Sequence, residues 1–130
     1  MVIDTSAVIA ILQQEAEAQQ FAELIAVDRY RLMSSVSQLE SAIVIGSRYG
    51  VTGQAQLDAL LRTHAISIIP FTLVQAEAAK IAYFAYGKGH HPARLNMGDC
   101  CSYALAKTTG EPLLFKGNDF SQTDIPIVDE

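Results

Sequence analysis

The first ten residues, Met1 to Ala10, read MVIDTSAVIA and place a single carboxylate inside an apolar stretch. Met1 to Ile3 predicts a short buried strand, and Thr5-Ser6 supplies the residue types that begin a helix. Asp4 therefore stands at the carboxyl end of the first strand. Because an ionised aspartate is costly to remove from water without a compensating partner, Asp4 needs one, and the rest of the sequence indicates which.

The chain has the size and composition of one globular domain. Its 130 residues are half hydrophobic and contain no linker-like stretch or internal repeat, so we expect a single domain over residues 1–130. The apolar runs, such as Ala7 to Leu12, are too short to span a membrane, which predicts a soluble cytoplasmic protein. The formal net charge of −5 argues against a broad nucleic-acid-binding surface but allows a small local site.

Strands and helices alternate along the rest of the chain. We predict strands at residues 1–3, 30–34, 66–69, 112–115 and 125–128, and helices at 7–14, 15–26, 37–50, 53–64, 72–86 and 96–107. This alternation predicts an α/β fold with a parallel sheet covered on both faces. In such folds functional groups gather beyond the carboxyl ends of the strands.

Four acidic residues fall where strand ends and helix starts share one rim. Asp4 follows the first strand and Glu40 lies in a first helical turn after the second. Asp99 opens a late helix, and Asp119 follows strand 112–115. Because these charges would repel one another, we predict that a shared divalent ion is the partner of Asp4. Oxygen ligands suit Mg²⁺ or Mn²⁺, which promote phosphodiester hydrolysis.

Each acid also fits an ordinary structural role. Asp4 and Asp99 fit helix N-caps, Ser37 to Glu40 fits a capping box, and Asp119 fits a turn. Only the joint placement of the four favours the functional interpretation.

The cysteines and histidines do not predict a metal site. Cys100 and Cys101 are adjacent, which disfavours both a disulfide and a zinc pair, so we expect reduced thiols with one in the core. His90 and His91 lie beside glycine and proline, which favours a solvated loop.

Four stretches together, residues 2–7, 37–43, 95–100 and 114–120, closely resemble the PIN-domain ribonucleases, particularly the VapC-type toxins of bacterial toxin-antitoxin pairs. The resemblance covers essentially the whole chain. It implies a three-layer α/β/α sandwich with a mostly parallel sheet and a Mg²⁺- or Mn²⁺-dependent endoribonuclease that cleaves RNA. It also implies a homodimer and inhibition by a cognate antitoxin protein.

The resemblance assigns roles to particular residues. It matches Asp4 and Asp99 to the principal metal ligands, and Glu40 and Asp119 to the remaining acids of the catalytic site. Thr5 and Ser6 match the small polar residues that orient the first aspartate or a bound water.

The basic and aromatic residues give a weaker indication of how RNA would bind. Arg94 and Lys116 are the leading candidates for phosphate contacts because both lie near the acidic motifs in sequence, although such residues are usually just solvated. Tyr83, Phe84 and Tyr86 are compatible with stacking on unpaired bases, but their helical spacing favours core and subunit interface.

Two other metal-dependent folds do not fit. A receiver module needs an aspartate after its third strand, where Ile69-Pro70-Phe71 stands. A haloacid-dehalogenase-type phosphatase needs a second aspartate at Ser6. The remaining alternative is a catalytically silent binding module that keeps the PIN fold.

Overall fold

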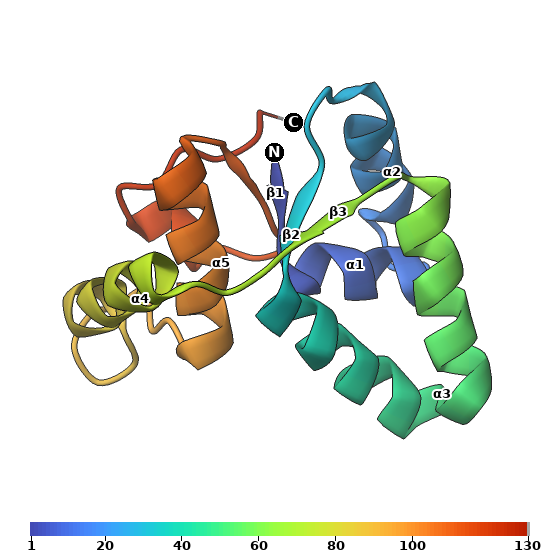
Figure 1. Ribbon diagram of the computed structural model, residues 1–130, viewed down its shortest axis with the longest axis horizontal. Coiled ribbons are helices and arrows are strands. Elements are labelled where there is room, and N and C mark those ends of the chain that lie inside the picture. The colour runs from blue at the N-terminus through green and yellow to red at the C-terminus, as the bar shows by residue number, and fades with distance from the viewer. Residues whose placement is uncertain (130) are drawn as a thin grey trace.

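The computed structural model describes residues 1–129 as a parallel sheet flanked by helices (Figure 1). The strand order is β3-β2-β1-β4, with every pairing parallel. The strands are β1 (Val2–Ile3), β2 (Leu32–Ser34), β3 (Ser67–Ile69) and β4 (Leu113–Leu114). The predicted parallel sheet is therefore confirmed, with the N-terminal strand β1 at its centre.

The helices form a layer on each face of this sheet. They are α1 (Thr5–Leu12), α2 (Ala18–Val27), α3 (Ser35–Thr63), α4 (Leu73–Tyr86) and α5 (Met97–Thr109), with a short 3-10 turn at Phe120–Gln122. In Figure 1, α1, α2 and α3 lie on one side of the strands and α4 and α5 on the other, which confirms the α/β/α sandwich. Within residues 1–129 no helix combines the length and apolarity needed to cross a bilayer.

Alternation along the short strands divides the core in two. Ile3 and Leu114 pack with α1, α2 and α3, whereas their neighbours Val2 and Leu113 pack with α4 and α5. Successive strand residues point to opposite faces, so two adjacent apolar residues are enough to serve both layers. The buried strand β1 therefore packs against the helices on both faces of the sheet.

Helix α3 changes direction at Gly50. This residue has φ 63° and ψ −147°, a conformation that essentially only glycine adopts. The sequence predicted two helices, 37–50 and 53–64, and the break falls where the first was expected to end.

Two local predictions were wrong. Residues 125–128 form no strand, and only Ile127 makes an isolated bridge to Leu113. The capping box from Ser37 to Glu40 is absent because α3 begins earlier, with the Ser34 side chain accepting from the Val36 N–H at 3.2 Å. Glu40 therefore lies in the second turn of α3, not the first.

Candidate active site

Asp4 ends β1 and caps α1, and the residue is almost completely buried, with 4% of its surface exposed. One oxygen accepts hydrogen bonds from the Ser6 N–H at 3.0 Å and the Ser6 hydroxyl at 2.7 Å. The other accepts from the Ser102 hydroxyl at 2.6 Å. Within residues 1–129, the hydrogen-bond partners of the Asp4 carboxylate are therefore Ser6 and Ser102.

Beneath Asp4, buried hydroxyls join three helices. The Ser102 and Ser37 hydroxyl oxygens lie 3.1 Å apart, and both residues are fully buried. The Thr5 hydroxyl donates to the Ser37 carbonyl at 3.3 Å and makes no hydrogen bond to the Asp4 carboxylate. Of the two predicted orienting residues, Ser6 makes the contact that such a role needs, while Thr5 ties α1 to α3.

Sequence reasoning missed Ser102, which is separated from Asp4 by 98 positions. The available signal was its spacing: Ser102 lies three residues after Asp99, on the same face of α5. A small hydroxyl at that position of a largely buried helix indicates a buried polar partner.

Asp99 occupies the third position of α5 and completes a capping box with Asn96. The Asp99 N–H donates to the Asn96 side chain at 2.8 Å, and the Asn96 N–H donates to the Asp99 carboxylate at 3.0 Å. Asn96, not Asp99, is therefore the N-cap. Burial, and then the charges of Asp4, Asp119 and Glu40, raise the pKa of Asp99 to about 7 against the opposing hydrogen bond from Asn96.

Glu40 reaches this cluster from α3 across the first turn of α5. A Cβ atom added to Gly98 would lie 2.6 Å from one Glu40 carboxylate oxygen and 2.9 Å from the other. Both distances are shorter than real side chains tolerate, so Glu40 occupies its place because residue 98 has no side chain. Gly98 is thus a positioning residue for the acidic edge.

Three of the four predicted acids line one open cleft of about 380 Å³. Asp4, Glu40 and Asp99 share it with Ser6 and Thr5. Asp119 is exposed at the start of the 3-10 turn and does not line the cleft, although its charge contributes to the raised pKa of Asp99.

Of the two predicted phosphate-contacting residues, Lys116 lines the cleft and Arg94 does not. The Lys116 ammonium pairs with Glu15 and, at 3.4 Å, with Glu17. Arg94 lies outside the cleft, on the loop after α4. Arg48 lines the cleft, and within residues 1–129 it makes no salt bridge. Arg48 is therefore the cation best placed to meet a phosphate.

The donor set suits a hard divalent cation, although the carboxylates are not gathered around a single point. Among residues 1–129, no three carboxylate, imidazole or thiol groups have the geometry to hold a metal ion. Asp4 is turned toward Ser6 and Ser102, and Asp99 toward the Asn96 N–H. The chemistry of carboxylate oxygens nevertheless fits Mg²⁺ or Mn²⁺, because a cation would offset the burial and the repulsion that together raise the pKa of Asp99.

The cysteines and histidines lie apart from this cleft. Cys100 and Cys101 are free thiols, and both are buried, where the prediction expected one. Burial raises the pKa of each thiol. His90 is exposed on the loop after α4, and the neighbouring His91 is half-buried with its Nδ1 accepting from the Ala93 N–H.

Comparison with known proteins gives consistent matches over nearly the full length. Residues 1–126 match the PIN domain family. The chain is 51% identical over 128 residues to ribonuclease VapC30 of Mycobacterium tuberculosis, covering 98% of each chain. It is also 51% identical to a ribonuclease VapC of Mycolicibacterium smegmatis, covering 98% of this chain and 99% of that one.

Solved structures share the fold at lower sequence identity. VapC20 of Mycobacterium tuberculosis, described as a toxin that cleaves the sarcin-ricin loop, matches with a TM-score of 0.77 and 17% identity, covering 99% of this chain and 98% of that one. A toxin-antitoxin complex from Klebsiella pneumoniae matches with a TM-score of 0.74 and 20% identity, covering 98% and 95%.

Proposed function

This chain belongs to the PIN-domain family, as a VapC-type member of it, and from that membership we propose that it is a metal-dependent endoribonuclease acting as the toxin of a toxin-antitoxin pair. Its substrate is RNA, whose phosphodiester bonds it hydrolyses. The cofactor is Mg²⁺ or Mn²⁺, and the acidic cleft is the catalytic centre.

The observation that carries this proposal is the cleft that Asp4, Glu40 and Asp99 share, and the raised pKa of Asp99 is consistent with it. Burial together with Asp4, Asp119 and Glu40 brings that pKa to about 7. Lys116, which lines the cleft, is paired with Glu15 and Glu17 instead. Within residues 1–129 none of these four acids makes a salt bridge, which favours a bound divalent ion.

Asp4 and Asp99 are the proposed principal metal ligands, with Glu40 and Asp119 completing the acidic set. A bound divalent ion supplies positive charge at the scissile phosphate and lowers the pKa of a water molecule. Ser6 and Ser102 fix the Asp4 carboxylate, and Asn96 fixes Asp99.

Arg48 has the proposed role of binding the RNA substrate. It lines the same cleft, so its guanidinium can bind a phosphate of the incoming RNA. The protein's part in catalysis is thus to orient oxygen ligands and to hold the substrate beside them.

Cleavage and metal binding are to be measured separately. Purified protein is incubated with mixed RNAs and Mg²⁺ or Mn²⁺, and calorimetry measures metal affinity. We expect Asp4→Asn to lower cleavage on the order of 10³-fold and to weaken metal binding, while the fold persists. Full cleavage by Asp4→Asn with normal metal binding would contradict the proposed centre. A folded wild-type protein that binds metal and RNA without cleaving would favour the silent binding module.

The proposed partners are a cognate antitoxin and a second copy of the chain. An antitoxin would place a basic side chain among the carboxylates. Sedimentation of the wild-type protein tests the dimer: we expect a particle with twice the mass of one chain. Expression of wild type without its antitoxin should slow growth, and equal toxicity of Asp4→Asn would separate that harm from cleavage.

A further inference from the structure

The segment from Ala78 to Gly98 differs in charge from the rest of the chain. It contains Lys80, Lys88 and Arg94 and no acidic residue, although the formal net charge of the protein is −5. It also carries three aromatic residues and two histidines, and it leads directly into Asp99. Cations interleaved with aromatic rings are the composition of a surface that binds single-stranded nucleic acid.

The rings at the end of α4 form a compact cluster. The ring centroids of Tyr83 and Phe84 are 5.7 Å apart, and His90 lies 5.6 Å from Tyr83 and 5.4 Å from Phe84, all edge to face. Phe84 nevertheless keeps 66% of its surface exposed. The neighbours that support this ring leave much of its surface open to a ligand.

The loop that carries the cations is held in place by backbone hydrogen bonds. The Lys88 N–H donates to the Leu95 carbonyl at 2.9 Å, and the Leu95 N–H donates to the Tyr86 carbonyl at 3.0 Å. Arg94 adopts φ 57°, a left-handed conformation that is uncommon outside glycine. Neither Lys88 nor Arg94 makes a salt bridge within residues 1–129, whereas Lys80 pairs with Glu77. Lys88 and Arg94 are therefore the cations available to a ligand.

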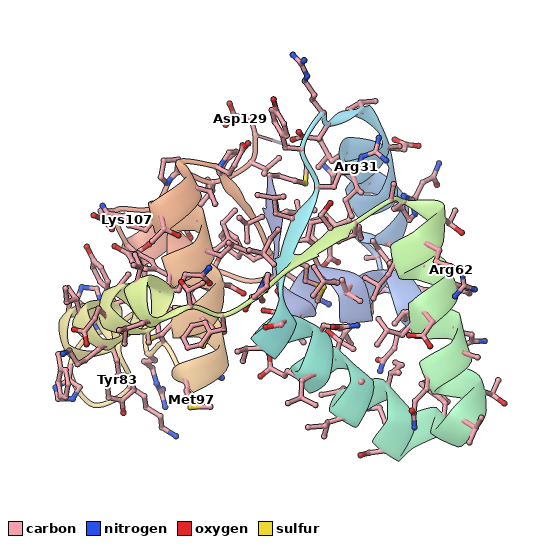
Figure 2. The ribbon with its side chains drawn as sticks, viewed as in Figure 1. Arg31, Arg62, Tyr83, Met97, Lys107 and Asp129 are labelled. Carbon is pink, nitrogen blue, oxygen red and sulfur yellow. The ribbon has the colours of Figure 1, made fainter. Side chains whose placement is uncertain are left out.

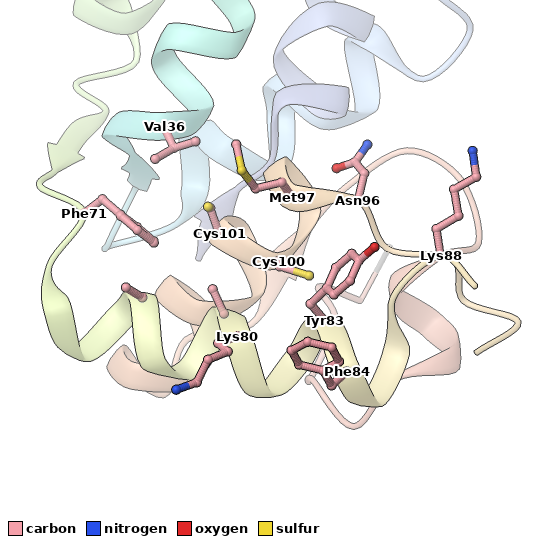
Figure 3. Close-up of a pocket in the computed structure, with 12 residues that line it drawn as sticks. Val36, Phe71, Lys80, Tyr83, Phe84, Lys88, Asn96, Met97, Cys100 and Cys101 are labelled. Atoms are coloured by element: carbon pink, nitrogen blue, oxygen red, sulfur yellow. The ribbon is translucent and has the colours of Figure 1, made fainter. Parts of the chain in front are cut away.

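A groove of about 660 Å³ connects these rings with the start of α5 (Figure 3). Tyr83, Phe84, Lys88 and Asn96 line one end of it, and the described lining includes no acidic residue. Asn96 also makes the capping box with Asp99. One residue thus belongs to both the groove and the acidic edge.

We propose that Tyr83, Phe84, Lys88 and Arg94 form a binding platform for a single-stranded segment of the RNA substrate, with an unpaired base stacked on Phe84 and phosphates contacting Lys88 and Arg94. The RNA then passes Asn96 to reach Asp99. This proposal rests on the proposed ribonuclease function and adds where the substrate lies outside the catalytic cleft.

Charge favours RNA over a second copy of the chain as the occupant. A two-fold dimer would bring the same surface of both copies together, and because residues 78–98 contain no acidic residue, this segment would offer Lys88 and Arg94 no carboxylate. RNA phosphates would instead neutralise them and release counterions. The platform is therefore complementary to a polyanion and not to itself.

RNA binding in EDTA tests the platform without cleavage. The probe is a fluorescein-labelled single-stranded RNA of mixed sequence, about 12 nucleotides long. We expect Phe84→Ala to bind it about tenfold to a hundredfold more weakly, and Phe84→Tyr to bind it as wild type does. Lys88→Ala/Arg94→Ala should reduce the slope of log affinity against log salt by about 1.4.

The matched control for charge is Arg62→Ala. Arg62 is an exposed cation in the last turn of α3, at the opposite end of the molecule from Tyr83 and Met97 (Figure 2). Equal losses of affinity for Arg62→Ala and for each of Lys88→Ala and Arg94→Ala would overturn the proposal, because the effect would then be net charge alone. Circular dichroism and melting temperatures check that each variant is folded.

Substitutions of Phe84 can overturn the platform in two further ways. If Phe84→Leu retains full RNA affinity, stacking is not the interaction, and the proposal is overturned. If Phe84→Ala converts a dimer to a monomer with RNA affinity unchanged, the face is a contact between copies, which also overturns it. If the protein cleaves RNA but the platform substitutions do not weaken RNA binding, the platform proposal is refuted and the ribonuclease function stands. If the substitutions weaken RNA binding but the wild-type protein does not cleave RNA, the ribonuclease function is refuted and the platform stands.

Discussion

The two ends of helix α5 hold carboxylates in opposite circumstances. At its first turn, Asp99 lies among other acids, and its pKa is raised to about 7. Beside its last turns, Asp124 accepts hydrogen bonds from the Tyr103 hydroxyl at 2.5 Å and the Lys107 ammonium at 3.0 Å. The Tyr103 hydrogen bond, and then Lys107, lower the pKa of Asp124.

Position on the helix alone would predict the reverse for Asp99. The amino end of a helix favours a negative charge, by about 0.3–1 kcal/mol for an exposed group. Burial and three neighbouring carboxylates outweigh that preference at Asp99. An acid that finds its cation within the chain is structural, whereas an acid that lacks one is available for an ion from solution.

Replacing the acid at each end with asparagine should have opposite effects on RNA cleavage and stability. This is the largest expected effect. We expect Asp99→Asn to lower RNA cleavage on the order of 10³-fold while the metal-free protein keeps or gains stability, because a repulsive charge is removed. Asp124→Asn should cleave RNA normally. It should unfold more readily by about 1–2 kcal/mol, because the charged partner of Tyr103 and Lys107 is lost.

Cleavage kinetics and denaturant unfolding in EDTA measure the two effects on the same preparations. If Asp124→Asn is as inactive as Asp99→Asn and its stability is unchanged, the prediction that Asp124 is structural and Asp99 functional is contradicted.

Gly98 offers a way to disturb the acidic end without removing an acid. In Gly98→Ala the new methyl group would displace the Glu40 carboxylate, whose side chain is flexible enough to move. We therefore expect cleavage and metal affinity to fall about tenfold to a hundredfold, with unfolding nearly unchanged. Calorimetry with Mn²⁺ and cleavage assays measure this.

A shorter acid and a second glycine provide the controls. The double variant Gly98→Ala/Glu40→Asp should recover part of the metal affinity, because the shorter side chain leaves room for the methyl group. Gly46→Ala, whose methyl would meet only the Gln54 side chain, should behave as wild type. Wild-type metal binding by Gly98→Ala would show that the placement of Glu40 is unimportant.

The contributions of Asp99 and Asp124 to the free energy of unfolding should also depend differently on pH. Since the pKa of Asp99 is about 7 in the folded protein and near 3.8 otherwise, the folded state holds a proton that the unfolded state has lost. The free energy of unfolding should therefore fall as pH rises from about 4 to 7, by at most a few kcal/mol. Asp124 works in the other direction, because its stabilisation is lost as pH falls below 3.8.

Urea unfolding of metal-free wild type, Asp99→Asn and Asp124→Asn, measured from below pH 3.8 up to pH 7, isolates each contribution as a difference between curves. We expect the decline between pH 4 and 7 to flatten in Asp99→Asn and to persist in Asp124→Asn. Parallel curves for wild type and Asp99→Asn would contradict the protonation of Asp99.

Removing only the cation at the structural end should have the smallest effect. The Lys107–Asp124 pair is about half exposed, so Lys107→Met should cost less than about 1 kcal/mol, with Tyr103 still bound to Asp124. Cleavage should be unchanged. A loss of activity in this variant, measured beside its melting temperature, would indicate that the two ends are coupled.

The sequence was informative where local pattern determines geometry. Asp4 had to end the first strand because MVI is apolar and Thr5-Ser6 begins a helix, and the parallel order brought the other acids to its edge. It was uninformative where partners meet only after folding. Ser102 is remote from Asp4 in sequence, and Arg48 reaches the cleft from within a long helical stretch.

Proximity in sequence placed Lys116 at the cleft but could not show that its ammonium is paired there. Lys116 stands near Asp119 in the chain, yet its ammonium faces Glu15 and Glu17. The Ser37 capping box failed for a related reason. Ser34 already caps α3, which leaves the Ser37 hydroxyl free for Ser102. A short motif predicts which bonds are available, while tertiary contacts decide which of them form.

The bend at Gly50 allows the chain to return from the end of β2 to the start of β3. Because β2 and β3 are parallel neighbours, the crossover between them must return to the starting end of a strand only about 10 Å long. An unbroken helix over the 29 residues of α3 would carry the chain about 43 Å away. With the reversal at Gly50, the outward half delivers Glu40 and Arg48 to the cleft, and the returning half brings the chain back to begin β3. A side chain at residue 50 would disfavour the backbone conformation that this reversal needs. Gly50 therefore affects both the pairing of β3 with β2 and the position of Glu40 at the cleft.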